Sequence, residues 1–144
     1  MARIKLEMPT TNSIADITIP VRITDINYGN HVGNDSFVAM IHEARVQWLK
    51  QHNYSELDFA GVGLIMNELV IEFKSESFYG DMINIKIFTG EISRVGFELY
   101  YRLTVKRNEE EILLGNAKTG MICYDYEKKK VTAVNDVIKQ ILSS

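Results

Sequence analysis

Hydrophobic and polar residues first alternate along the chain between Ile14 and Thr24. Alternation with a period of two is typical of a half-buried strand. Pro20 lies inside this run and lacks a backbone N–H, so we expect an edge strand or a bulge there. The face expected to point into the core carries Ile17, Ile19, Val21 and Ile23.

From Ser36 to Lys50 the spacing changes, and apolar residues recur three and four positions apart. This spacing predicts a helix with an unusually wide apolar stripe, which other structure must surround. Asn34 or Asp35 is expected to cap its N-terminus. The stripe consists of Phe37, Val38, Met40, Ile41, Ala44, Trp48 and Leu49.

The rest of the chain is dominated by long strand-like runs separated by short polar or glycine-containing turns. Turns of two to four residues favour antiparallel neighbours. One short helical turn is expected first, within Tyr54 to Ala60, and an amphipathic helix ends the chain. The runs cover residues 64–79, 82–93, 97–106 and 112–126, and the final helix covers 133–142.

This order of elements predicts an α+β fold in which an antiparallel sheet curls around one long central helix. Residues 1–144 are expected to form a single domain, since their number and composition suit one globular core. Such a sheet leaves edge strands, and pairing two sheets edge to edge is one way to protect them. A homodimer is therefore expected, or a dimer of two such dimers.

Composition narrows the functional classes. The formal net charge of −3 comes from interspersed charges, so the chain has no basic field that would attract nucleic acid. The single Cys123 excludes an intrachain disulfide and suits a reducing compartment; its apolar surroundings predict a buried structural thiol.

The N-terminus lacks a signal-peptide pattern, and no apolar run approaches the ~20 residues that span a bilayer. We therefore expect a cytoplasmic protein without membrane insertion.

Polar, titratable and glycine residues are concentrated between the first strand and the long helix, in residues 24–35. Loops held by regular elements often carry function, so the active site is expected here. One cysteine and three histidines lack the spacing of a zinc site, and the chain has no phosphate-binding glycine loop. No metal or separate cofactor is expected.

Three stretches resemble motifs of a known enzyme family. Asp25-Ile26-Asn27 with His31-Val32-Gly33-Asn34 resembles a D-x-D…H-V-x-N loop, and residues 42–49 resemble an E-E-A-R-x-x-x-L helix. Glu72-Phe73 with Gly80-Asp81-Met82 resembles an E-Y…D-D-x-L segment.

Over residues 17–126 the chain therefore resembles the hotdog-fold thioesterases. The similar branch contains 4-hydroxybenzoyl-CoA thioesterase, bacterial acyl-CoA thioesterases and the plant acyl-ACP thioesterases. The resemblance implies a hotdog fold and hydrolysis of an acyl-CoA or acyl-ACP thioester. Coenzyme A or ACP would then enter only as part of the substrate.

In this family the second aspartate of D-x-D activates water or attacks the thioester, but the matching residue here is Asn27, whose amide cannot act as a base. Asp25 retains a carboxylate. His31 matches the loop histidine of the acyl-ACP thioesterases, and an imidazole, with an ordinary pKa of ~6.5, suits general-base work. The hypothesis is that His31 or Asp25 activates water while Asn27 orients water or substrate.

The carbonyl oxygen of a thioester needs N–H donors where negative charge develops. Backbone N–H groups of Gly33, Asn34 and Asp35, at the helix start, are the candidates. Glu43 either faces a partner subunit's site or pairs on the surface with Gln47 or Arg45. The acyl chain is expected along the helix near Phe37, Met40 and Ile41. Glu68 and Glu76 receive no role, although Glu76 lies within one residue of a site position in the plant enzymes.

Two other functions stay open. Hotdog enoyl-CoA hydratases and dehydratases carry a D-x-N-P-x-H loop that Asp25, Asn27 and His31 resemble, but here an extra residue separates the pair and Tyr28-Gly29 replaces the proline. The replacement of the usual aspartate by Asn27 also fits a non-catalytic acyl-thioester-binding module that dimerises.

Overall fold

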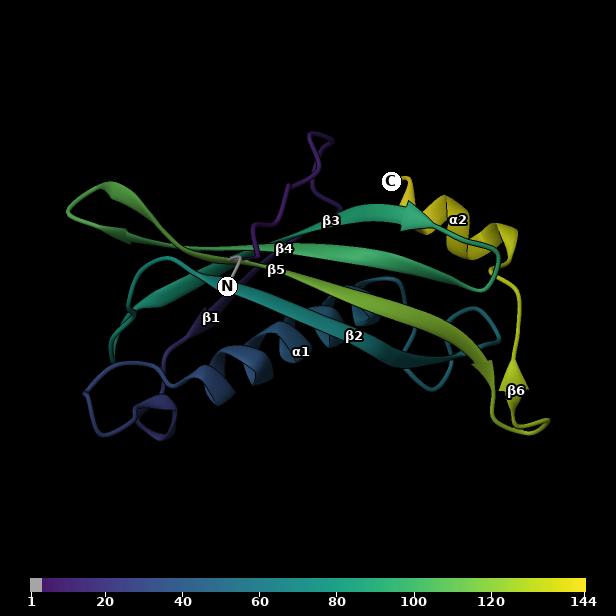
Figure 1. Cartoon of the computed structure of the whole chain (residues 1–144), viewed down its shortest axis with the longest axis horizontal. Helices are drawn as coiled ribbons and strands as arrows, with labels where there is room; N and C mark the ends of the chain where they lie inside the picture. The colour runs from purple at the N-terminus through teal and green to yellow at the C-terminus, as the bar shows by residue number, and fades with distance from the viewer. Residues whose placement is uncertain (1–3) are drawn as a thin grey trace.

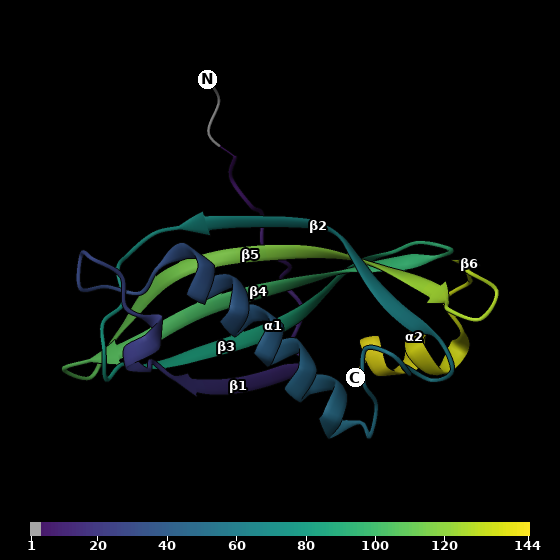
Figure 2. The ribbon, with the colours of Figure 1, turned by 90° about the horizontal axis from the view of Figure 1, so that it is seen from below.

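In the computed structural model, which describes residues 4–144, an antiparallel sheet curves across one long helix (Figure 1, Figure 2). The strand order is β1-β3-β4-β5-β2, and β6 pairs with β5. The predicted α+β architecture is therefore confirmed. The strands are β1 (Ala15–Pro20), β2 (Gly63–Phe73), β3 (Met82–Ile92), β4 (Gly96–Arg107), β5 (Glu110–Asp125) and β6 (Lys130–Val131).

β1 is an edge strand and ends at Pro20, as the missing N–H predicts. Ile17 and Val21 are buried, but the expectation that Ile23 shares their face is wrong, because Ile23 is 69% exposed. The chain turns there into the 3₁₀ helix η1 (Ile23–Asp25), which ends the alternation of a strand. At the opposite edge lies β2.

The long helix α1 (Asn34–Gln51) begins two residues before the predicted start. Its N-cap is Gly33, whose carbonyl accepts the N–H groups of Ser36 and Phe37. The prediction of Asn34 or Asp35 as N-cap is wrong, since helical hydrogen bonding already starts at Gly33. The apolar stripe is buried except for the half-buried Val38, and the buried face is Phe37, Met40, Ile41, Ala44, Arg45, Trp48 and Leu49.

The core lies between α1 and one face of the sheet (Figure 2). Every second residue of the central strands points into this core. The alternation of apolar and polar residues in the sequence therefore indicates which face of each strand is buried. In β3 these residues are Ile83, Ile85 and Ile87, and in β4 they are Phe97, Leu99, Tyr101, Leu103 and Val105.

The final helix α2 (Asp136–Leu142) begins three residues later than predicted, because the Asn135 side chain caps it by accepting the Ile138 N–H. The helical turn expected within Tyr54 to Ala60 is absent. Instead Phe59 and Val62 exchange backbone hydrogen bonds across a tight turn, where Ala60 and Gly61 adopt positive φ. That turn buries the Phe59 ring against Trp48, at 5.7 Å between ring centroids. Within residues 4–144, no helix is long and apolar enough to cross a membrane.

Candidate active site

The loop between η1 and α1 is closed by the backbone and side chain of Asn27. Its amide Oδ1 accepts the Gly29 N–H at 2.9 Å, and its own N–H donates to the His31 carbonyl at 3.0 Å. The Asn30 N–H donates to the Asn27 carbonyl, and Asn30 adopts a φ of 61°, which asparagine tolerates well. The resulting turn presents His31 beside the start of α1.

His31 is held with one ring nitrogen free. Its side chain is one-third exposed, and Nδ1 lies 3.3 Å from the Val32 carbonyl oxygen. A carbonyl only accepts hydrogen bonds, so Nδ1 must carry the proton in this contact, and Nε2 of the neutral ring then bears a lone pair. Nε2 lies 3.8 Å from Oε1 of Glu76. The geometry thus gives a proton acceptor with a carboxylate beside it.

A cleft of about 230 Å³ opens next to this pair. Its apolar part is formed by Phe37 of α1 and Phe73 at the end of β2, whose ring centroids are 5.6 Å apart. Phe73 is 45% exposed, so its ring faces solvent at the mouth. The cleft is lined by His31, Val32, Asn34, Phe37, Phe73, Lys74, Ser75 and Glu76.

The N-terminus of α1 supplies fewer free donors than the sequence predicts. The Gly33 N–H donates to the Asp25 carbonyl at 3.1 Å, so the expectation that it polarises a substrate is wrong. The N–H groups of Asn34 and Asp35 belong to the first turn, which has no intrahelical acceptors. Among residues 4–144 neither has a hydrogen-bond acceptor, and Asn34 lines the His31 cleft.

The Asp25 carboxylate is buried and hydrogen-bonded within its own turn. Its side chain is only 5% exposed, and Oδ2 accepts the Arg22 N–H at 2.8 Å, which caps η1. Asp25 lines a different cleft, between β1 and α1, together with Glu43 and Gln47. The structure therefore does not bring the Asp25 carboxylate into the cleft that holds His31.

Glu43 accepts a hydrogen bond from Gln47 Nε2 at 2.6 Å on the exposed side of α1. This is one of the two surface pairings expected from the sequence. The other is not formed, because Arg45 turns inward and pairs with Glu56.

Glu76 is the site residue that sequence analysis leaves without a role. It lies in the connection between β2 and β3, and the Ser77 carbonyl in that connection accepts the Val32 N–H at 2.8 Å. One backbone hydrogen bond between two loops thus brings Glu76 beside His31. The signals in the sequence are its place between the Glu72-Phe73 and Gly80-Asp81 parts of one motif and its place within one residue of a site position in the plant enzymes.

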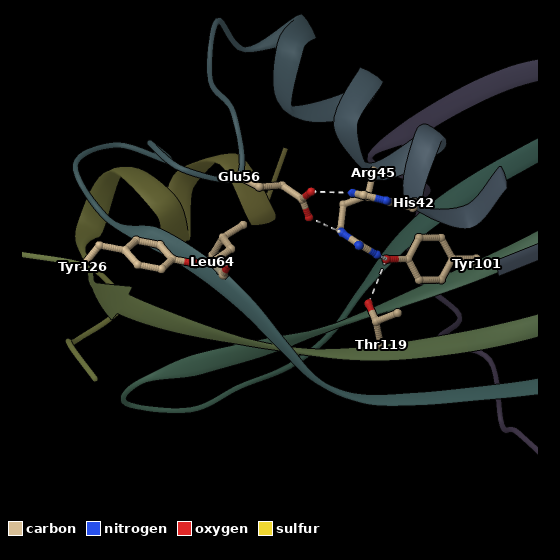
Figure 3. Close-up of polar contacts among 7 residues, drawn as sticks. All are labelled: His42, Arg45, Glu56, Leu64, Tyr101, Thr119 and Tyr126. Atoms are coloured by element: carbon tan, nitrogen blue, oxygen red, sulfur yellow. Dashed lines mark hydrogen bonds and ion pairs between the residues drawn. The ribbon is translucent and has the colours of Figure 1, made fainter. Parts of the chain in front are cut away.

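A buried polar network anchors the middle of α1 to the sheet (Figure 3). Arg45, 4% exposed, donates to Glu56 at 2.9 Å and to the Tyr101 hydroxyl at 3.2 Å. His42 lies 2.6 Å from the other Glu56 oxygen, and the Tyr101 hydroxyl lies 2.7 Å from that of Thr119. The arginine of the helix motif is thus a structural anchor.

The pKa shifts in this network follow from burial and from the contacts. Burial raises the pKa of the Tyr101 hydroxyl. Burial also opposes the charge on Glu56, but the hydrogen bonds from Arg45 and His42 outweigh it, so the pKa of Glu56 lies below its ordinary value. For Arg45, the contacts with Tyr101 and Glu56 outweigh burial and raise the pKa.

Other candidate groups lie outside the cleft. Cys123 is fully buried, and burial raises the pKa of its thiol to about 11, which fits a structural role. His52 is the C-cap of α1, where a cation is favourable. Among residues 4–144, no three histidine, cysteine or acidic side chains lie close enough together to hold a metal ion.

Comparisons with known proteins identify the family of the chain. The model of the thioesterase-like superfamily matches residues 21–142. An acyl-CoA thioester hydrolase of Escherichia coli, YbgC, is 29% identical over 119 residues, which cover 80% of this chain and 87% of the relative. The same alignment is found with YbgC of Shigella flexneri.

Solved structures of similar fold include a 1,4-dihydroxy-2-naphthoyl-CoA thioesterase from Synechocystis. It has a TM-score of 0.78 and 19% sequence identity, over 90% of this chain and 95% of the other. A 4-hydroxybenzoyl-CoA thioesterase variant, solved with 4-hydroxybenzoyl-CoA, has a TM-score of 0.79 and 13% identity, over 89% and 97% of the two chains. At these identities the likeness concerns the fold, which is the hotdog fold expected from the sequence.

Proposed function

The chain belongs to the thioesterase-like superfamily, and from this premise we propose that it hydrolyses the thioester bond of an acyl-CoA or acyl-ACP. The observation that carries this proposal is the placement of His31. Its Nδ1 lies against the Val32 carbonyl, so Nε2, which bears the lone pair when the ring is neutral, lies in the cleft with Glu76 and the Phe37 and Phe73 rings. The relationship to YbgC, an acyl-CoA thioester hydrolase, supports coenzyme A as the carrier.

In the proposed mechanism, His31 Nε2 takes a proton from a water molecule while the water oxygen attacks the thioester carbon. Negative charge develops on the carbonyl oxygen, where the Asn34 and Asp35 N–H groups stabilise it. The Glu76 carboxylate stabilises the imidazolium that forms. The C–S bond then breaks with its electron pair on sulfur, the imidazolium returns the proton to the thiolate, and the products are a carboxylic acid and a free thiol.

The proposed position of the acyl group is the apolar side of the cleft. Phe37 and Phe73 line the cleft that holds His31, whereas Met40 and Ile41, expected from the sequence to line the acyl chain, do not line it. Asn27 keeps the role of shaping the loop and orienting water. Asp25 acts through its carbonyl and its cap of η1, which fix the approach to α1.

We propose in addition that two copies pair through their β2 edges. β2 is hydrogen-bonded to β5 on one side and is an edge of the sheet on the other, and its Ile65, Met66 and Phe73 are more than one-third exposed. An unpaired edge of this length favours pairing with a second chain. A dimer of such dimers and a cytoplasmic location complete the proposal, the latter supported by a single cysteine that suits a reducing compartment.

The test is release of free thiol from a panel of acyl-CoA and acyl-ACP substrates, followed with a thiol reagent. The parent protein should release thiol well above buffer, and His31→Ala should lose about 10²-fold or more in kcat. His52→Gln is the matched control, because this histidine lies at the other end of α1.

Two outcomes would replace the proposal. Hydration of a 2-enoyl-CoA without thiol release would identify a hydratase. Binding of a non-hydrolysable acyl-CoA analogue with neither reaction would identify a binding module, the alternative that Asn27 at the usual aspartate position favours.

A further inference from the structure

The side chain of Arg107, the last residue of β4, is hydrogen-bonded to the β2–β3 connection, which carries Glu76. The start of α1, the β2–β3 connection and the β4–β5 hairpin meet at one end of the molecule in both views (Figure 1, Figure 2). We propose that Arg107, acting through Asp81, is a positioning residue that fixes the position of Glu76 relative to the loop that carries His31. This inference rests on the proposed role of His31 and Glu76 in thioester hydrolysis.

Arg107 makes a set of contacts that only a guanidinium can make together. Nη2 lies 2.5 Å from Asp81 Oδ2, and Nε lies 3.5 Å from Oδ1 of the same carboxylate. Nη2 also donates to the Glu76 carbonyl at 3.1 Å, and the guanidinium carbon lies 5.0 Å from the centroid of the Phe78 ring. A forked cation of this shape bridges a carboxylate, a carbonyl and a ring face, whereas a lysine ammonium is a point charge.

The Asp81 carboxylate in turn organises the connection. Its Oδ2 accepts the Ser77 hydroxyl at 2.8 Å and the Phe78 N–H at 2.9 Å. Burial opposes the charge of Asp81, but the hydrogen bonds from Arg107, Phe78 and Ser77 outweigh it and lower its pKa. The carboxylate therefore stays charged at neutral pH. Its hydrogen bonds tie Ser77 and Phe78 to Asp81 within the β2–β3 connection.

The β2–β3 connection is hydrogen-bonded to the loop that carries His31. Ser77 is fully buried, and its carbonyl accepts the Val32 N–H, next to His31. The Asp81 carbonyl accepts the Val21 N–H at 2.9 Å, at the end of β1. Arg107 thus stabilises one segment that sets both the position of Glu76 and the backbone beside His31. Without Arg107, the Glu76 carbonyl loses its side-chain hydrogen-bond donor and Asp81 loses its counter-ion.

The test compares Arg107→Gln, Arg107→Lys, Glu76→Gln and the double variant Arg107→Gln/Glu76→Gln with the parent. Because a small misplacement of a catalytic group is costly, Arg107→Gln should lower kcat by about tenfold with KM within about threefold. Arg107→Lys should recover part of that loss. If both residues act through one arrangement, the double variant should lose no more than the larger single loss.

Lys118→Gln is the control, since it also removes a cation from ion pairs, with Glu68 and Glu98, away from the cleft. It should leave kcat unchanged. Multiplying losses in the double variant, or an Arg107→Gln rate equal to the parent, would overturn the positioning role.

A second measurement does not depend on turnover. The Cε1 proton of His31 should shift in the NMR spectrum in the same direction in Arg107→Gln and Glu76→Gln, and should not shift in Lys118→Gln. If the parent releases no thiol, the proposed function fails while this shift still tests whether Arg107 positions the pair. If the parent is active and the His31 signal is unmoved in Arg107→Gln, the positioning role alone is overturned.

Discussion

The Cα atom of Gly29 faces the imidazole of His31 so closely that a Cβ atom at position 29 would lie 2.9 Å from Nε2. The same Cβ would lie 3.4 Å from Oδ1 of Asn27, so the two side chains flank this glycine. A contact of 2.9 Å is shorter than side chains tolerate, and the ring would have to move. The glycine thus serves the placement of His31 by its lack of a side chain.

Gly29→Ala should therefore lower kcat by about tenfold, because the displaced ring no longer aligns Nε2 with the substrate. Gly29 does not adopt positive φ, so alanine fits its backbone and the melting temperature should change little. Thr24→Ala, in the preceding η1 turn, is the control and should retain full activity. Unchanged thiol release in Gly29→Ala would show that the ring relaxes without consequence.

Removal of the buried cation Arg45 should destabilise the fold. Arg45→Met removes a charged hydrogen-bond donor from both Glu56 and Tyr101, and breaking a buried ion pair costs about 3–5 kcal/mol. We expect about 2–3 kcal/mol here, since Glu56 is 25% exposed and keeps His42. Urea unfolding measures this loss. Lys118→Gln, which removes ion pairs with the solvent-accessible Glu68 and Glu98, should stay within about 1 kcal/mol of the parent.

Asp81 makes stability depend on pH. Its pKa in the folded protein lies below the ordinary value of 3.8, so its contribution is complete above pH 3.8 and is lost as the pH falls through the folded pKa. Asp81→Asn should cost about 1–3 kcal/mol at pH 7, and this difference from the parent should shrink below pH 3.8. Melting temperatures of both proteins, measured from about pH 7 down to about pH 2.5, below the ordinary pKa of 3.8, check the sign. A difference that is constant with pH would contradict it.

The long elements could be predicted from the sequence because their buried side chains repeat. The period of two marks β3 and β4, and helical spacing marks α1, since one face of each is buried in the same core. The structure of residues 54–60 could not be predicted in this way. Phe59 is buried by a tight turn with Ala60 and Gly61 at positive φ, and no repeating pattern of apolar residues indicates such a turn.

The candidate site could be predicted only in part. The loop that carries Asn27 and His31 stands out as a polar segment between a strand and a helix. The neighbouring Glu76 does not, because its position depends on a hydrogen bond between Val32 and Ser77, two loop residues without periodicity. The burial of Arg45 was also missed, although it lies four positions after Ile41 on the buried face.

Cys123 should not interfere with thiol-based assays. It is the only cysteine, it is fully buried, and the raised pKa of about 11 keeps its thiol protonated at neutral pH. The native protein should therefore react negligibly with a thiol reagent at pH 8, whereas the urea-unfolded chain should react once per molecule. Rapid labelling of the native protein would contradict this burial.

The last prediction concerns the amide that stands where the family has a carboxylate. Asn27→Asp keeps an acceptor for the Gly29 N–H, so the turn should survive, whereas Asn27→Ala should loosen it. The new carboxylate would lie near Gly33, the N-cap of α1, where a negative charge is favourable.

Asn27→Asp should therefore retain kcat within about threefold of the parent, and Asn27→Asp/His31→Ala should recover part of the loss of His31→Ala, because the new carboxylate can activate water in place of the imidazole. Thiol release from the best acyl-CoA substrate measures both. An Asn27→Asp variant as slow as His31→Ala would instead mean that the amide itself is needed, as an N–H donor to water or substrate that a carboxylate cannot replace.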